Sequence, residues 1–393
     1  MSENFLGYER ENGYGTRNHV LIIPTVTCSE YIARKIAKDG LKLRKPKNAS
    51  IKVLHNPYGC SQTGNDLEQT MRTIINAGVN PNVHSVLLVS LGCETLDYER
   101  VADEISKFKT VSFIKIQDLG REKTIQKGID SLKALLNDAN TLRRKPADLS
   151  WLAVGLECGG SDFTSGIASN PVVGKVSDWV VQNGGTSIIG EVPEFIGAEH
   201  IYAERAKNNE VKNKIISTVI KFESKLKSEG KSDFRGDQPG RGNMDGGLTT
   251  IEEKSIGASM KSGTSSVTGV LDYAERFKSK GHFLMNSPGD DIESVSGMVS
   301  AGCNIILFTT GRGTPTGNVI APVVKITAND ETFHVMNSLI DFDCSSILNG
   351  TETVERASGR LKSLIISVAS GTSTKAEKNE QDDFSIYRIG PTY

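Results

Sequence analysis

The chain has 393 residues, of which 46 are Lys or Arg and 47 are Asp or Glu, with 37% hydrophobic and 24% charged residues. This length predicts two or three domains, and the balanced charge argues against a partner nucleic acid. No apolar signal segment opens the chain and no later run is long enough for a bilayer, so we expect a cytoplasmic protein without a membrane role. The six cysteines are too dispersed for a disulfide scaffold, which predicts reduced thiols.

Short, nearly continuous apolar runs predict buried strands. They lie at residues 20–26, 51–55, 86–91, 113–116, 151–156, 187–189, 305–308 and 323–326. Helical spacing of apolar residues fills the intervals between the early runs, over residues 30–43, 67–75, 98–108 and 123–136. This alternation predicts an α/β fold of at least two domains, with mostly parallel sheets and Rossmann-like units.

Changes in composition predict the domain boundaries. A charged stretch with Pro146, over residues 142–149, is typical of a linker and would close an N-terminal α/β domain at residues 1–148. A second α/β segment, residues 149–235, would carry a long polar helix from 198 to about 228. A C-terminal α/β domain, residues 236–393, would begin with a segment rich in Gly, Ser and Thr that we expect to form active-site loops.

Polar loops with Cys, His or carboxylate side chains follow five of the predicted strands. Their sequences are PTVTCSE, HNPYGCSQTG, LGCETLD, ECGGSDFTSG and GEVPEFIGAEH. Because ligands bind outside the carboxyl ends of strands in parallel sheets, these loops predict a site for metal binding or proton transfer. An iron–sulfur cluster stays open as an alternative, because Cys28, Cys60, Cys93 and Cys158 could converge in space.

The loop FTTGRGTPTGN at residues 308–318 predicts an anion pocket. Arg312 would supply a bidentate guanidinium, and the flanking Gly311 and Gly313 would supply backbone amides. The loop lacks the Lys of a Walker motif, which argues against nucleotide binding.

Taken together, these blocks resemble the altronate/galactarate dehydratase family, which includes the large subunit of sulfolactate sulfo-lyase. The similarity covers nearly the whole chain and is carried by GYERENGYGTRNHV, HNPYGCSQTGND, ECGGSDFTSGIASNP, GNMDGGLTTIEEKSIGASMKSG and AGCNIILFTTGRGTPTG. The resemblance implies a hydro-lyase that uses Fe2+ or Mn2+ to convert a sugar acid such as altronate or galactarate to a 2-keto-3-deoxy acid. Such a β-elimination needs a cation, a base at the α-carbon and an acid at the leaving hydroxyl.

The resemblance also implies roles for individual residues. The expected metal ligands are His55, Glu94, Glu191 and Glu194. His200 is the expected base, and Glu194, Cys158 and Asp162 complete the expected catalytic set. The residues expected to bind the substrate carboxylate are Arg17, Asn18, Arg205 and Arg312, with Gly311 and Gly313.

Two alternatives remain at this stage. The chain could be the large subunit of a (2R)-sulfolactate sulfo-lyase that releases sulfite and pyruvate, or a non-catalytic subunit that binds sugar acids. The family's dehydratases carry a small domain before the GYxRxNG block, which here begins at Gly7, so a separate small subunit is an expected partner. Homo-oligomerisation is expected on general grounds.

Overall fold

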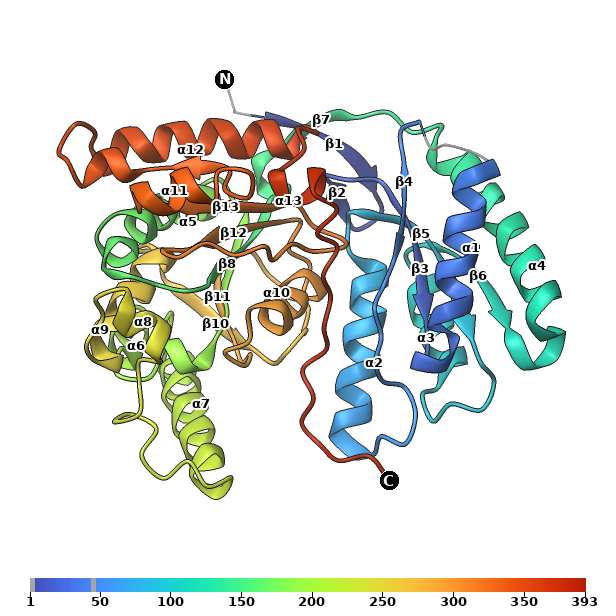
Figure 1. Cartoon of the computed structure of the whole chain (residues 1–393), viewed down its shortest axis with the longest axis horizontal. Helices are drawn as coiled ribbons and strands as arrows, with labels where there is room; N and C mark the ends of the chain where they lie inside the picture. Colours follow the sequence, from blue (N-terminus) through green and yellow to red (C-terminus); the bar gives the residue numbers. More distant parts are fainter. Residues whose placement is uncertain (1–3, 44–46) are drawn as a thin grey trace.

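The computed structural model describes residues 4–43 and 47–393. Figure 1 shows two α/β bodies side by side, with the N-terminal part of the chain in blue to teal and the C-terminal part in green to red. Within the described residues, no helix is both long and apolar enough to span a bilayer.

The N-terminal domain is built on a four-stranded parallel sheet in the order β4-β3-β5-β6. Its strands are β3 (His19–Pro24), β4 (Ser50–Val53), β5 (Val83–Ser90) and β6 (Thr110–Lys115). Every residue of β3 is buried because helices cover both faces of the sheet. One face packs on α1 (Glu30–Leu43) and α4 (Ile116–Ala139), and the other on α2 (Gly64–Val79) and α3 (Tyr98–Ser106).

The C-terminal domain is built on a seven-stranded parallel sheet in the order β10-β11-β9-β8-β12-β13-β14. Its strands are β8 (Ala153–Cys158), β9 (Thr186–Ile189), β10 (Val267–Leu271), β11 (Gly281–Met285), β12 (Ile305–Thr309), β13 (Val323–Thr327) and β14 (Phe342–Asp343). Helices α5 (Asn170–Gln182) and α12 (Val354–Ala369) contribute to the core on one face. Helix α10 (Asp291–Ser300) covers the other face and shares a hydrophobic core with α2 of the first domain.

Two further segments join the domains. A small antiparallel sheet in the order β2-β1-β7 pairs β1 (Asn4–Arg10) with β2 (Gly13–Gly15) and β7 (Lys145–Asp148), and β1 also contacts α12. The C-terminal tail returns to the first domain, where the Tyr393 amide donates to the Ser61 carbonyl (Figure 1, red). The tail therefore connects the end of the chain to the loop that follows β4.

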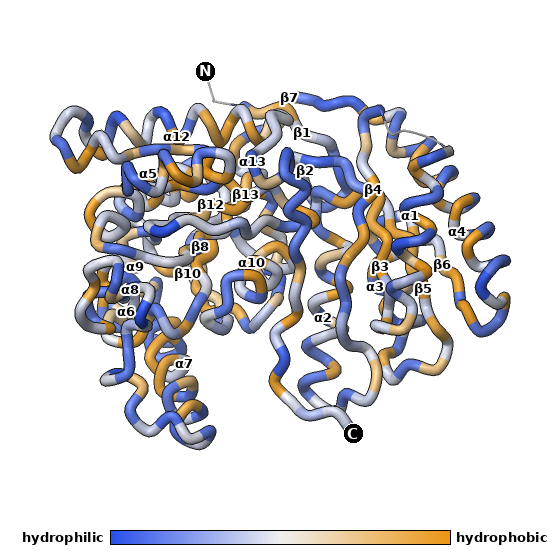
Figure 2. Tube along the Cα trace, viewed as in Figure 1, coloured by the Kyte–Doolittle hydropathy of each residue, from blue (hydrophilic) through white to orange (hydrophobic). Residues whose placement is uncertain are grey.

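The predicted α/β class with parallel sheets is confirmed, and each of the eight apolar runs coincides with a strand. Figure 2 shows the hydrophobic residues of β3 and β5 inside the first domain. The antiparallel strands were not predicted, and neither were β10, β11 and β14 of the parallel sheet. Residues 149–235 and 236–393, expected as separate domains, contribute strands to one sheet.

The polar helix expected over residues 198–228 is two helices, α6 (Glu199–Glu204) and α7 (Asn209–Ser228). The break has a local cause, because the Asn208 side chain accepts a hydrogen bond from the Val211 amide and so caps α7. The Gly-rich segment that follows holds α8 (Arg241–Asp245), α9 (Ile251–Ser259) and the 3-10 turn η5 (Met260–Ser262). Two further short α-helices are α11 (Asp330–Val335) and α13 (Lys375–Lys378).

Candidate active site in the C-terminal domain

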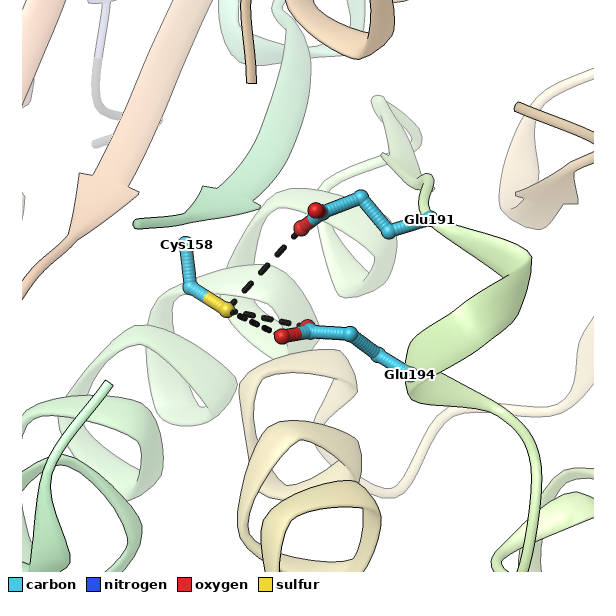
Figure 3. Close-up of side chains that lie close together, drawn as sticks. All are labelled: Cys158, Glu191 and Glu194. Atoms are coloured by element: carbon cyan, nitrogen blue, oxygen red, sulfur yellow. Dashed lines mark hydrogen bonds between the residues drawn. The ribbon is translucent and has the colours of Figure 1, made fainter. Parts of the chain in front are cut away.

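Three buried side chains meet at the carboxyl edge of the seven-stranded sheet (Figure 3). Cys158 ends β8, Glu191 follows β9, and Glu194 lies in the 3-10 turn η4 (Val192–Glu194). The Cys158 Sγ lies 2.8 Å from Glu194 Oε1 and 3.9 Å from Glu191 Oε2. We call these three residues the thiol–carboxylate cluster.

The backbone at Glu191 is held in an unusual conformation. Its φ of 67° is left-handed, which costs a residue other than glycine on the order of 1–3 kcal/mol. The Glu191 amide donates to Ser287 Oγ at 2.7 Å, which helps to hold this turn. A Cβ on the preceding Gly190 would lie 2.5 Å from Ser294 Oγ, so a larger residue there would displace that serine side chain. Strain of this kind is typical of functional sites, and here it directs the Glu191 carboxyl toward Cys158.

Two lysines oppose the negative charge of the cluster. The Nζ atoms of Lys261, in η5, and Lys254, on α9, lie 3.1 Å and 3.5 Å from the Glu194 carboxylate. Burial alone would raise the pKa of Glu194, but these two ammonium groups outweigh it and hold that pKa below its usual value. Lys261 is fully buried, and burial would lower its pKa, yet the neighbouring Cys158 thiol and glutamate carboxyls raise it well above normal. Glu194 is therefore ionised within a buried ion network.

The other acidic groups of this region hold protons more tightly. Burial, followed by the charge of Glu194, raises the pKa of the Cys158 thiol to about 12. Burial also raises the pKa of Glu157 to about 7 and, with the neighbouring Glu157 and Glu194 carboxyls, raises that of Glu191 well above normal. Perturbed groups of this kind are characteristic of catalytic centres.

The thiol–carboxylate cluster fits a divalent metal ion. One sulfur and two carboxylate oxygens lie within 4.8 Å of one another, and this donor set suits an ion of intermediate softness such as Fe2+. Glu157 Oε2, on the neighbouring residue of β8, is buried without a hydrogen-bond partner among the described residues. The excess of buried acidic groups around the two lysines would be offset by a cation.

The cavity next to this cluster lies at the point where the strand order reverses. Strands β9 and β12 lie on opposite sides of β8. The chain passes from β8 to β9 first and reaches β12 later. Ligands bind at such a crevice in parallel sheets. A cavity of about 330 Å³ is lined there by Ser161, Asp162 and Lys254, and a second of about 540 Å³ shares Asp162 and adds Arg312. Since Ser161 Oγ lies 3.4 Å from Cys158 Sγ, the first cavity borders the cluster.

Asp162 organises the loops around these cavities. One carboxylate oxygen accepts hydrogen bonds from Thr164 and Ser165, and the other accepts from Asn329 Nδ2 at 2.9 Å. Gly311 packs against this carboxyl group so closely that a Cβ there would lie 2.2 Å from it. The close contact with Asp162 therefore explains why position 311 is a glycine.

In the loop at residues 308–318, the backbone amides do not have the anion-binding role expected of them. The amides of Gly311 and Arg312 both donate to the Gly160 carbonyl, and the Gly313 amide donates to Thr310 Oγ1. These amides therefore hold the loop itself together and do not form the expected cradle. The Arg312 side chain is exposed and lines the larger cavity, so its guanidinium is the group available to a carboxylate.

The other expected carboxylate clamps hold protein segments together. Arg17 uses all five of its N–H donors on Glu377 and on the carbonyls of Thr16, Val368 and Thr372. No donor of Arg17 is left for a substrate.

Asn18 donates to the Asn48 and Ala139 carbonyls and accepts a hydrogen bond from Arg10. Arg205 donates to Ser262 Oγ and the Gly263 carbonyl. It thereby supports the turn that carries Lys261.

The remaining expected site residues lie apart from the thiol–carboxylate cluster. His55 and Glu94 belong to the N-terminal domain, where His55 Nδ1 lies 2.9 Å from Glu30 and Glu94 accepts from Thr25 Oγ1 and the Gly92 amide. His200 is exposed on α6. Cys28, Cys60 and Cys93 are also in the N-terminal domain and are exposed.

Sequence reasoning missed Lys254 and Lys261. Both lie in the Gly-rich segment that was expected to form active-site loops, but nothing in the spacing of EEKSIGASMKSG distinguishes a buried lysine from a solvated one. Their role depends on the packing of α9 against η4 and of η5 against α5, which are contacts between distant parts of the chain.

A buried acid cluster with paired lysines lies at the switch point of a parallel sheet, beside a cavity lined by Arg312. This arrangement is typical of the active site of an α/β enzyme. Residues 149–392 match the family described as D-galactarate/Altronate dehydratase, C-terminal, and residues 7–140 match D-galactarate dehydratase/Altronate hydrolase, second domain. The chain belongs to this family of hydro-lyases.

Its relatives carry different names. The chain is 37% identical to altronate dehydratase of Bacillus subtilis, over 100% of this chain and 79% of that one. It is 35% identical to (2R)-sulfolactate sulfo-lyase subunit beta of Chromohalobacter salexigens, over 98% of this chain and 97% of that one. It is 33% identical to galactarate dehydratase (L-threo-forming) of Escherichia coli, over 93% of this chain and 73% of that one.

Proposed function

We propose that this protein dehydrates a sugar acid of the altronate or galactarate type to a 2-keto-3-deoxy acid. The observation that carries the proposal is the thiol–carboxylate cluster, buried beside the cavities lined by Lys254 and Arg312. A β-elimination next to a carboxylate develops negative charge on that carboxylate, and fixed positive groups stabilise it.

In this proposal the two cavities bind different parts of the substrate. Arg312 holds a terminal carboxylate of the substrate through its planar guanidinium. Lys254 lies at the border of the smaller cavity and contacts Glu194, so its ammonium stabilises the charge that develops as the α-proton leaves. Ser161 and Asp162 line the space between the two groups and shape it for a hydroxylated chain.

Cys158, Glu191 and Glu194 would hold the divalent ion, for which Fe2+ and Mn2+ are the proposed identities. When bound, such an ion supplies positive charge that stabilises an enediolate and weakens the bond to the leaving hydroxyl. Lys261 fixes the orientation of the Glu194 carboxylate by its contact at 3.1 Å.

We assign proton transfer to the carboxyl groups at this edge and no longer to His200. Glu157 neighbours Glu191, and one of its oxygens is buried with no hydrogen-bond partner among the described residues. His200 is exposed on α6 and is not part of the thiol–carboxylate cluster. Glu157→Gln should therefore lower kcat by about 100-fold, a typical contribution of general acid–base catalysis, whereas His200→Ala should change it little.

A second candidate is elimination of sulfite from a sulfolactate, in which the same clamp and charge stabilisation would serve a different leaving group. The observation in its favour is the 35% identity to a sulfo-lyase subunit over nearly the full length of both chains. Because that relative is named as subunit beta, we also propose that this chain works with a smaller partner subunit. Homo-oligomerisation of this chain is a further proposal, which mass photometry of the purified protein would test.

The test is a substrate comparison on anaerobically purified protein supplied with Fe2+ or Mn2+. Formation of a 2-keto-3-deoxy acid from altronate or galactarate supports the dehydratase, and sulfite release from sulfolactate supports the second candidate. Absence of turnover with all three, with and without a co-expressed small subunit, would contradict both and favour a sugar-acid-binding protein.

A further inference from the structure

A second group of reactive side chains lies in the N-terminal domain, at the carboxyl edge of its four-stranded sheet. Cys28, Cys60 and Cys93 follow β3, β4 and β5, which are neighbours in the order β4-β3-β5. All three thiols are exposed, whereas Cys158, Cys303 and Cys344 are buried. Because free cysteines are among the most buried residue types, three exposed ones at one edge call for an explanation.

Direct contacts hold the three cysteine-bearing loops together. The Thr27 amide, next to Cys28, donates to the Tyr58 carbonyl at 3.0 Å. The Gly59 carbonyl, next to Cys60, accepts from the Leu96 amide at 3.0 Å, and the Ser61 amide donates to Thr95 Oγ1. The loop that carries Cys60 therefore bridges the loops that carry Cys28 and Cys93.

The backbone beside two of the cysteines is also constrained. Gly59 and Ser61, on either side of Cys60, have φ values of 100° and 58°, and Gly92, before Cys93, has a φ of 119°. A Cβ on Gly59 would lie 2.2 Å from the Thr25 carbonyl oxygen, so the loop packs directly on the end of β3. Left-handed residues of this kind, Ser61 above all, persist only where the surroundings enforce them.

The position agrees with the rule for ligand sites in parallel sheets. The strand order reverses between β3 and β5, since the chain passes from β3 to β4 on one side and returns to β5 on the other. Cys28 and Cys93 lie in the segments that follow the two strands flanking this switch point, where the loops separate and a ligand can enter.

We propose that Cys28, Cys60 and Cys93 bind an iron–sulfur cluster, separate from the thiol–carboxylate cluster of the C-terminal domain. Thiolates are the usual ligands of such clusters. A single zinc ion would need sulfur atoms about 3.8 Å apart, as follows from Zn–S bonds near 2.3 Å. Among the described residues, the group that brings its ligand atoms within 4.8 Å is Cys158, Glu191 and Glu194, so the three exposed thiols are not spaced for a single zinc ion.

Three cysteines leave one iron of a four-iron cluster without a protein sulfur. That iron is then open to water or to a small oxygen ligand from the solvent side, because all three loops are exposed. Cys158 is not needed for this site, since it ends β8 in the other sheet and its Sγ contacts Glu194.

The test measures iron and inorganic sulfide in the full chain, purified without oxygen and, in parallel, reconstituted with Fe2+ and sulfide. We expect equal amounts of each, roughly four per chain, with the broad visible absorption of a cluster. Cys28→Ser, Cys60→Ser and Cys93→Ser should each lower the sulfide content at least tenfold. Circular dichroism checks that each variant is folded.

Two controls separate this site from the rest of the molecule. Cys303→Ala removes a buried thiol elsewhere, and Cys158→Ser removes the sulfur of the thiol–carboxylate cluster, and both should keep the sulfide. Zinc without sulfide, a disulfide between two of the three cysteines, or iron and sulfide that persist in the three Ser variants would each overturn the proposal. These outcomes are independent of turnover, so they do not depend on the proposed dehydratase activity.

Discussion

The two sheets end in loops of similar composition, yet their surroundings give those loops different chemistry. At the edge of the four-stranded sheet the thiols are exposed and His55 pairs with Glu30 near solvent. At the edge of the seven-stranded sheet Cys158 is buried against carboxylates, and the fully buried Lys261 balances them. Strand topology places the residues in both cases, but burial and the opposing charges decide what they can do.

The largest expected effect concerns the buried thiol–carboxylate cluster at the edge of the seven-stranded sheet. Glu194→Gln keeps the shape of the side chain and removes its charge, so kcat should fall by about 1000-fold, because the proposed metal ligand and the partner of two lysines are lost together. Glu355→Gln, on α12, is a matched exposed control and should turn over normally. Steady-state kinetics on both variants give the comparison, and near-normal turnover of Glu194→Gln would place the chemistry elsewhere.

A second prediction concerns the stability of the buried charges. Lys261→Met removes a fully buried cation and leaves the Glu194 carboxylate short of a partner, which should cost about 3 kcal/mol of unfolding free energy. Urea denaturation of the metal-free protein measures the change. Lys278→Met, at an exposed position, should leave the midpoint within experimental error. Equal midpoints for the two variants would show that Lys261 is not part of a buried ion network.

Four strands of the second sheet, β8, β9, β12 and β13, and the polar loops at its edge could be predicted from the sequence because apolar runs followed by polar loops are local features. Cys158 ends β8, and Glu191 and Glu194 lie in the segment after β9, so this pattern placed all three among the candidate residues. The separation of His55 and Glu94 from them could not be predicted, because loop composition does not say which sheet a strand joins.

The roles of Arg17 and Lys261 escaped prediction for a related reason. Both depend on contacts between distant segments: Arg17 binds Glu377, and Lys261 binds Glu194. In sequence, each is simply a charged residue in a Gly-containing stretch. The resemblance to dehydratases identified the family but not the geometry of each charged side chain.

A third prediction contrasts two arginines that looked equivalent in the sequence. Arg312→Lys should raise KM about tenfold, because a point charge replaces the planar fork in the cavity. Arg17→Lys should leave KM unchanged and lower the thermal midpoint, because it breaks hydrogen bonds to Glu377 and to backbone carbonyls. The reverse pattern would mean that Arg17 is the clamp.

A fourth prediction concerns pH and two buried histidines, one in each domain. Burial lowers the pKa of His19 and of His282 to about 3, whereas an unfolded histidine titrates near 6.5. The unfolded chain therefore binds more protons below pH 6.5, so stability is full above that pH and falls on acidification toward pH 3. The expected slope is about 1.4 kcal/mol per pH unit for each histidine.

Urea unfolding of the metal-free protein between pH 7.5 and pH 5 measures this slope. His282→Gln should make the curve less steep than in the wild type, whereas His200→Gln, at an exposed position, should leave it unchanged. If His282→Gln does not alter the slope, the imidazole is not held neutral in the folded protein.

The most direct test of the account is the location of the divalent metal site. Mn2+ is added to the metal-free full chain, and its binding is measured as the loss of the free-ion EPR signal. We expect one tight site per chain. Glu194→Gln should weaken that site at least 100-fold, and Glu94→Gln, at the other sheet, should leave it unchanged. Loss of the site in Glu94→Gln together with normal binding in Glu194→Gln would contradict the assignment of the metal to the C-terminal domain.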